Sequence, residues 1–230
     1  MSTQTCLLPL GLAAAVTIGL ASPAGAAKVP LAEARIFIEY NYSGNDLGFH
    51  VFLDGEDWEE LRIMSPTGRT IFEVEGKGGF GMLGMTELFF EGAEPSLDDV
   101  PLEELLALFP EGKYRFVGET VDDDIIVGTA RLNHRIPDPP VIVSPQEGEV
   151  VDSSQPVVID WDPVANPPGG SIVAYQVIVG KFQITLPASK TQVTVPPEFL
   201  DPGTEYLFEV LAIEVGGNQT IRESSFATQD

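Results

Sequence analysis

Short alternations of apolar and polar residues, separated by turn residues, run through most of the chain after its first 26 residues. Apolar side chains at every second position are typical of a β-strand with one buried face. Gly, Pro, Asn and Asp between such runs favour turns. The pattern therefore predicts an all-β protein with little helix. In the N-terminal half the expected strands are residues 35–42, 48–53, 60–64, 70–75 and 86–90, with Gly55, Gly68 and the glycine cluster at 76–84 in turns.

One segment of the N-terminal half departs from this alternation and predicts a short amphipathic helix near residues 101–109. Pro101 suits a first helical position, where its missing amide hydrogen costs nothing. The apolar residues that follow fall on one face of a helix, and they are Leu102, Leu105, Leu106 and Phe109.

A proline-rich run at residues 137–140 separates two stretches of expected strands. Proline fixes φ, lacks an amide donor and restricts the residue before it. Such a run is a stiff, non-helical connector of the kind found at domain boundaries. We therefore expect one domain at residues 28–136 and a second at residues 137–230.

The second stretch carries aromatic and turn residues at characteristic places. Trp161 lies in an early strand, Tyr175 in a middle strand, Leu200 and Tyr206 around a turn, and Gly217-Asn218 before the last strand. With this set, residues 138–228 resemble a fibronectin type III domain. The resemblance implies a seven-stranded sandwich with a tyrosine corner, in which the Tyr206 hydroxyl bonds to the backbone upstream. It identifies a fold rather than a function, because this sandwich serves unrelated roles.

The end of the first stretch echoes that corner. Residues 109–116 parallel residues 200–208, with one residue fewer before the tyrosine, which is Tyr114. Both segments continue as a strand, a polar turn and a closing strand. We therefore expect the first domain to be an immunoglobulin-like sandwich as well. The predicted fold class is all-β, with two tandem immunoglobulin-like β-sandwiches and one short helix in the first, which matches no family of known activity.

The first 26 residues differ from the rest of the chain. Residues 7–20 are apolar apart from Gly, Pro and Thr, and Ala24-Gly25-Ala26 follows as a small-residue cleavage pattern. This is typical of a secretory signal peptide, whereas a spanning helix needs about 20 apolar residues. We expect residues 1–26 to be a signal peptide and the mature protein to be secreted, extracellular or periplasmic, without membrane insertion after cleavage.

Charge and cysteine content narrow the functional classes. The chain has 35 acidic and 12 basic side chains and a net charge of −23. Such a surface repels phosphate backbones and anionic lipid, so we expect no nucleic-acid partner. The single cysteine, Cys6, lies in the expected signal peptide. The mature chain would therefore lack cysteine nucleophiles and thiolate zinc sites.

Candidate chemistry is sparse. His50 and His134 are far apart and belong to no catalytic motif, so a structural role is the simpler interpretation. Trp58 beside Asp54 and Asp57 is the least weak carbohydrate site. Calcium takes several oxygen ligands, so acidic turns are candidate calcium sites. They are Asn45-Asp46, Asp54-Gly55-Glu56-Asp57 and Asp122-Asp123-Asp124. Turns whose carboxylates are simply solvated are the simpler interpretation.

Residues 76–90, rich in Gly, Met and Phe, predict either an adaptable contact patch or a buried strand after a loop. We assign no catalytic, cofactor-binding or metal residue and no cofactor, and we expect no enzymatic activity. The expected function is an exported binding, adhesion or spacer protein whose partner is an unknown protein or glycan. The alternatives are an accessory module of secreted carbohydrate-active machinery, or a calcium-dependent envelope or matrix component.

Overall fold

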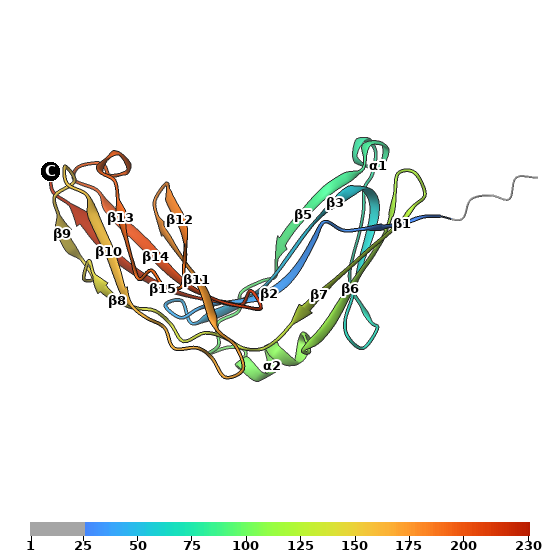
Figure 1. Cartoon of the computed structure of the whole chain (residues 1–230), viewed down its shortest axis with the longest axis horizontal. Helices are drawn as coiled ribbons and strands as arrows, with labels where there is room; N and C mark the ends of the chain where they lie inside the picture. The colour runs from blue at the N-terminus through green and yellow to red at the C-terminus, as the bar shows by residue number, and fades with distance from the viewer. Residues whose placement is uncertain (1–25) are drawn as a thin grey trace, which may run out of the picture.

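The computed structural model describes residues 26–230 and confirms the all-β fold class, with two β-sandwiches in tandem. The expected signal peptide lies outside the described residues except for Ala26. The two sandwiches diverge like the arms of a V, with β2 and β15 at the vertex and α2 on its outer side (Figure 1).

The first sandwich holds the N-terminal strands and both α-helices. The predicted helix near residues 101–109 is confirmed as α2, which places Leu105 in the core. The elements are β1 (Lys28–Pro30), β2 (Glu33–Asn41), β3 (Asp46–Met64), β4 (Thr70–Glu75), α1 (Gly79–Leu83), β5 (Met85–Glu91), α2 (Leu102–Leu108), β6 (Gly112–Thr120) and β7 (Ile125–Leu132).

Strand β3 differs from the prediction, because residues 48–53 and 60–64 belong to one strand and no turn occurs at Gly55. Its first half pairs with β2 and β5, and its second half pairs with β4 and β6. The register shifts between Asp54 and Trp58, where the partners of the strand change from β2 and β5 to β4 and β6 within one continuous sheet. A Cβ atom on Gly55 would lie 2.8 Å from Leu31 Cδ2, so this glycine permits a close approach.

The second sandwich has two layers of strands. Strands β13, β10 and β8 form one layer, and β12, β11, β14 and β15 form the other, with β9 beside β15. The bounds are β8 (Val141–Ser144), β9 (Glu149–Val151), β10 (Val157–Asp162), β11 (Ile172–Val179), β12 (Phe182–Pro187), β13 (Gln192–Val195), the 3-10 helix η1 (Pro197–Phe199), β14 (Glu205–Glu214) and β15 (Gln219–Thr228).

Each sandwich encloses its own core. Trp58 and Tyr114 have no exposed surface in the first core, and Trp161 packs edge-on against Tyr175 at 5.3 Å in the second. The Tyr206 hydroxyl accepts a hydrogen bond from the Asp201 amide at 2.7 Å, as the corner predicts.

The first sandwich has a corresponding corner. The Tyr114 hydroxyl donates to the Pro110 carbonyl at 3.0 Å, so the proposed echo between the two segments is present in the structure. Both corners tie a tyrosine at the start of a long strand to the backbone that precedes it.

The two sandwiches share a sheet. Residues Gln219–Ile221 of β15 pair in parallel with Glu39–Asn41 of β2. This pairing gives a continuous strand order of β1-β7-β6-β3-β2-β15-β14-β11-β12. The connector at residues 133–140 has no regular secondary structure and runs beside this pairing.

Candidate functional site

A buried polar joint lies where the two sandwiches meet. The Asn218 side chain has no exposed surface. Its Oδ1 accepts from the Ile38 amide at 2.9 Å, and its Nδ2 donates to the carbonyls of Asn133 at 2.9 Å and Arg135 at 3.1 Å. The Thr220 hydroxyl donates to the Pro137 carbonyl at 2.7 Å. The start of β15 is therefore bonded to both β2 and the connector.

A charged pair completes this joint. Glu214 is fully buried, and its Oε1 accepts from Asn133 Nδ2 at 3.0 Å. Its Oε2 lies 3.6 Å from Nε of Arg135 in the connector. The Arg135 side chain is 32% exposed, but separating it from the fully buried Glu214 would leave that carboxylate without its cation, so these contacts resist separation of the two sandwiches.

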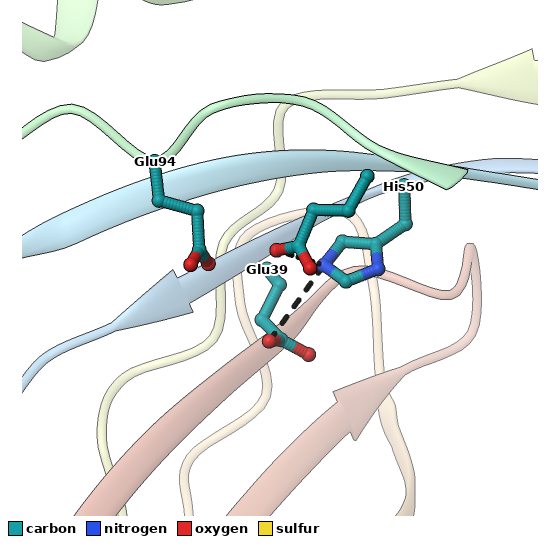
Figure 2. Close-up of side chains that lie close together, drawn as sticks. Glu39, His50 and Glu94 are labelled. Carbon is teal, nitrogen blue, oxygen red and sulfur yellow. Dashed lines mark ion pairs between the residues drawn. The ribbon is translucent and has the colours of Figure 1, made fainter.

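Next to the joint, four side chains form what we call the Glu–His cluster: Glu39, His50, Glu91 and Glu94. In the ladders, His50 lies opposite Phe37 on β2 and opposite Glu91 on β5. Side chains two positions apart on a strand share a face, so Glu39 lies on the same face as Phe37. Glu94 comes from the loop after β5, and Figure 2 shows it with Glu39 and His50 around a common space.

The ligand-type atoms of the Glu–His cluster all lie within 4.8 Å of one another. His50 Nε2 is 2.9 Å from Glu91 Oε1 and 3.6 Å from Glu39 Oε1 (Figure 2). Neither approach has the alignment of a hydrogen bond, and neither ring nitrogen of His50 has a hydrogen-bond partner. The ring is 6% exposed and stacks on Phe37 at 4.9 Å. A buried polar ring without partners is costly unless something else satisfies it.

The electrostatics of the cluster favour a cation. Burial raises the pKa of Glu39 and the pKa of Glu94, and Glu91 raises that of Glu94 further. Burial also lowers the pKa of His50, against the opposing effect of Glu39 and Glu94. Within residues 26–230, no Lys or Arg forms an ion pair with Glu39, Glu91 or Glu94. Three carboxylates therefore surround an imidazole whose pKa is lowered by burial.

Comparison with known proteins decides the identity of the second sandwich. The family described as "Fibronectin type III domain" matches residues 143–228. These residues form a fibronectin type III domain. The match agrees with the packed pair of Trp161 and Tyr175 and with the Tyr206 corner. No curated protein matches the sequence of the chain.

Several solved structures are similar to the chain as a whole. The fibronectin(III)-like modules of Clostridium thermocellum CbhA are 10% identical, with a TM-score of 0.39, over 87% of this chain and 94% of that one. A two-domain fibronectin type III segment of chicken tenascin is 15% identical, with a TM-score of 0.29, over 88% and 98%. A 1.5-MDa bacterial ice-binding adhesin is 13% identical, with a TM-score of 0.30, over 89% and 65%.

The Glu–His cluster belongs to the first sandwich, but the fibronectin type III domain contacts it. Gln219, the first residue of β15, donates a side-chain hydrogen bond to Glu39 Oε2. Sequence reasoning missed this cluster and treated His50 as an isolated structural histidine. The available signal was a polar residue inside each of two otherwise apolar runs, Glu39 within residues 36–40 and His50 within residues 47–53. Their proximity depends on the order of β2, β3 and β5, which no local pattern gives.

The structure buries the tryptophan of the least weak carbohydrate candidate. Trp58 is fully buried in the first core, so its interpretation as a sugar platform beside Asp54 and Asp57 was wrong. Trp58 lies at the irregularity of β3 where its pairing partners change, and its side chain faces the first core. None of these three residues belongs to the fibronectin type III domain or to the Glu–His cluster.

The acidic turns have structural partners. Asp122–Asp124 form the β6–β7 turn, where Asp124 Oδ1 accepts from the Ala27 amide at 2.7 Å. Asn45 Nδ2 donates to Asp98 Oδ1 at 3.1 Å, and burial raises the pKa of Asp46. His134 Nε2 lies 2.8 Å from the Phe109 carbonyl, which suits a structural role.

The segment at residues 76–90 divides between the two interpretations offered for it. In α1, Phe80, Met82 and Leu83 are 68%, 82% and 78% exposed. In β5, Leu88 and Phe90 pack against the first core. The exposed part lies at the end of the first arm, away from the vertex (Figure 1).

Proposed function

We propose that the chain is an exported, non-catalytic binding and spacer protein in which the two sandwiches act as one bent, rigid piece. The observation that carries this proposal is the continuation of the sheet from β2 into β15. Domains joined only by a linker move relative to each other by default. Here the backbone pairing and the buried bonds of Asn218 oppose such motion.

The non-catalytic part of the proposal is supported by the fold. Fibronectin type III and other immunoglobulin-like sandwiches are typically recognition or spacing modules, and any activity must come from a site added to them. A rigid bend sets the distance and angle between whatever binds at the two arms. The partner is of the protein or glycan class, since a net charge of −23 opposes nucleic-acid binding.

Export is supported by the apolar run at residues 7–20 and the small residues that follow it. Within residues 26–230, no helix has the length and apolar character needed to cross a membrane. Fibronectin type III modules are common in extracellular proteins, which agrees with this destination.

Rigidity is testable by spin labelling, because the only native cysteine, Cys6, precedes the mature chain. Lys77→Cys and Lys190→Cys place labels on exposed loops of the two sandwiches. We expect double electron–electron resonance to give a narrow distribution of distances between the two labels. This distribution should broaden in the Asn218→Ala variant. Thr228→Ala is the matched control, because Thr228 is a buried polar residue of β15 that bonds within its own domain. A broad distribution in the unmodified protein contradicts the proposal.

Export and the absence of catalysis need separate tests. Expression with the native leader, followed by cell fractionation and intact mass, should give a mature protein outside the cytoplasm that begins near residue 27. A panel of polysaccharides and peptides should show no turnover. Retention of the full-length chain in the cytosol, or hydrolysis at an enzymatic rate, contradicts the corresponding part of the proposal.

A further inference from the structure

We propose that Glu39, His50, Glu91 and Glu94 bind a divalent first-row transition-metal ion of the zinc class. The inference goes beyond the proposed function, since a rigid bent spacer does not need a metal. It rests on the buried imidazole without hydrogen bonds and on the carboxylates that surround it.

The spacing of the donor atoms suits ligands that share one ion. Zn–N and Zn–O bonds of about 2.0–2.1 Å in a tetrahedral site place ligand atoms roughly 3.3 Å apart. His50 Nε2 is 2.9 Å and 3.6 Å from the nearest oxygens of Glu91 and Glu39, on either side of that value. Because these contacts are not aligned as hydrogen bonds, the ring nitrogen remains available to an ion. Glu94 lies on an exposed loop, so it can move to complete the ligand set without any change in a strand.

The charge of the cluster supplies the driving force. Three carboxylates lie beside one imidazole, and no Lys or Arg of the described chain forms an ion pair with them. A divalent cation replaces mutual repulsion with attraction at a partly buried position, where screening by solvent is weak.

The donor set selects the class of metal. Calcium and magnesium take oxygen ligands, and calcium prefers 6–8 of them. Imidazole nitrogen together with carboxylate oxygen suits zinc, iron and related ions instead. The calcium candidates among the acidic turns contain no histidine, although burial raises the pKa of Asp46 and Glu94 lies close enough for its charge to raise that pKa further.

The fibronectin type III domain supports this site from outside. Gln219 donates to the Glu39 oxygen that does not face His50. Such a bond to a ligating carboxylate fixes its orientation, and losing it typically lowers metal affinity about 10–100-fold. A bound ion at this position would lie beside the β2–β15 pairing, and Gln219 would connect its ligand Glu39 to the second sandwich.

Titration of the tag-free mature chain with ZnCl₂ by isothermal calorimetry tests the proposal, with CaCl₂ and MgCl₂ run in parallel. We expect one equivalent of Zn²⁺ to bind and at least about 100-fold weaker binding in His50→Gln, because the only nitrogen ligand is lost. His134→Gln is the matched control and should bind as the unmodified protein does. Gln219→Ala should weaken binding by about 10-fold or more.

Two further measurements keep the test decisive if His50→Gln fails to fold. Glu94→Gln changes an exposed loop residue, so it should fold normally and still weaken Zn²⁺ binding by about 10-fold or more. In NMR spectra of the imidazole nitrogens, Zn²⁺ should shift the His50 signals and leave those of His134 unchanged. The proposal is overturned if Zn²⁺ does not bind at millimolar concentration, if its binding is unchanged in Glu94→Gln, or if Ca²⁺ binds equally well. Spin-label distances recorded with a chelator test the rigid joint independently of these outcomes.

Discussion

The two sandwiches reach similar architecture by different means. In the fibronectin type III domain, each strand belongs to one layer, with Trp161 and Tyr175 between the layers. In the first sandwich, β3 passes through both layers, and Trp58 lies in the core at the irregularity where the partners of the strand change. The tyrosine corners also differ, since Tyr206 accepts a backbone hydrogen bond and Tyr114 donates one.

This difference shows that similar cores are compatible with different strand connectivity, provided that each layer of strands buries one face. It also shows where distinctive chemistry arises. The outer face of the first sandwich carries the Glu–His cluster, whereas the fibronectin type III domain contributes Gln219 at its margin. Substitution of the core aromatic residues tests whether the stability of each sandwich depends equally on its hydrophobic core.

The largest expected effect comes from the two tryptophans. Trp58→Ala and Trp161→Ala should each lower the free energy of unfolding by about 3–5 kcal/mol, because both remove fully buried aromatic volume. Urea denaturation followed by circular dichroism measures both variants. If Trp58→Ala lowered the free energy of unfolding by less than about 1 kcal/mol, the two cores would not contribute equally to stability.

A smaller effect is expected at the joint between the sandwiches. Asn218→Ala removes hydrogen bonds to Ile38, Asn133 and Arg135 and should lower the free energy of unfolding by about 3 kcal/mol. The calorimetric transition should also split into two, since the sandwiches lose their coupling. Thr228→Ala should destabilise the fibronectin type III domain without this splitting; equal splitting in both variants would contradict the role of the joint.

The tyrosine corners should each contribute about 1 kcal/mol, a typical net value for one hydrogen bond. Tyr114→Phe and Tyr206→Phe remove the hydroxyl and leave the ring in place. Chemical denaturation of the two variants side by side measures the comparison. A silent Tyr114→Phe would mean that only the corner of the fibronectin type III domain contributes to stability.

The pH dependence distinguishes Tyr114 further. Burial raises the pKa of Tyr114 to about 12, above the ordinary tyrosine value of 10.0, so the fold favours the neutral phenol. This stabilisation is fully present below about pH 10 and is lost as the pH rises from there through about 12. We expect Tyr114→Phe to lose less stability over this alkaline range than the unmodified protein. Identical alkaline profiles would contradict the buried environment of the hydroxyl.

The smallest effect is expected at the end of the first arm. Met82 is 82% exposed, so Met82→Ser should change the free energy of unfolding by less than about 0.5 kcal/mol. Thermal unfolding of this variant is the measurement. A loss above about 2 kcal/mol would show that α1 packs against the sandwich in solution.

Local patterns predicted the features that depend on residues close in sequence. The Tyr206 corner, the α2 helix and the strand β4 follow from spacing within a few residues. The Asp54-Gly55 step misled because it resembles a hairpin turn, whereas the apolar alternation continues beyond it into Trp58.

The features that escaped prediction depend on contacts distant in sequence. Asn218 looked like an ordinary turn residue, yet its partner Asn133 lies 85 positions away. Glu39 and Glu94 reach His50 only because β2, β3 and β5 are neighbours in one sheet. Polar residues in such positions have no local signature, because the pairing order of strands decides what they meet.

The buried Asn218 has a consequence for how the protein is produced. It begins the tripeptide Asn-Gln-Thr, the acceptor pattern for N-linked glycosylation. In a secretory pathway that attaches oligosaccharides to a nascent chain, modification at this position would precede folding. A glycan of that size has no room where the side chain has no exposed surface. A eukaryotic secretory host would therefore yield protein with separated sandwiches, and a host without this modification is the suitable source.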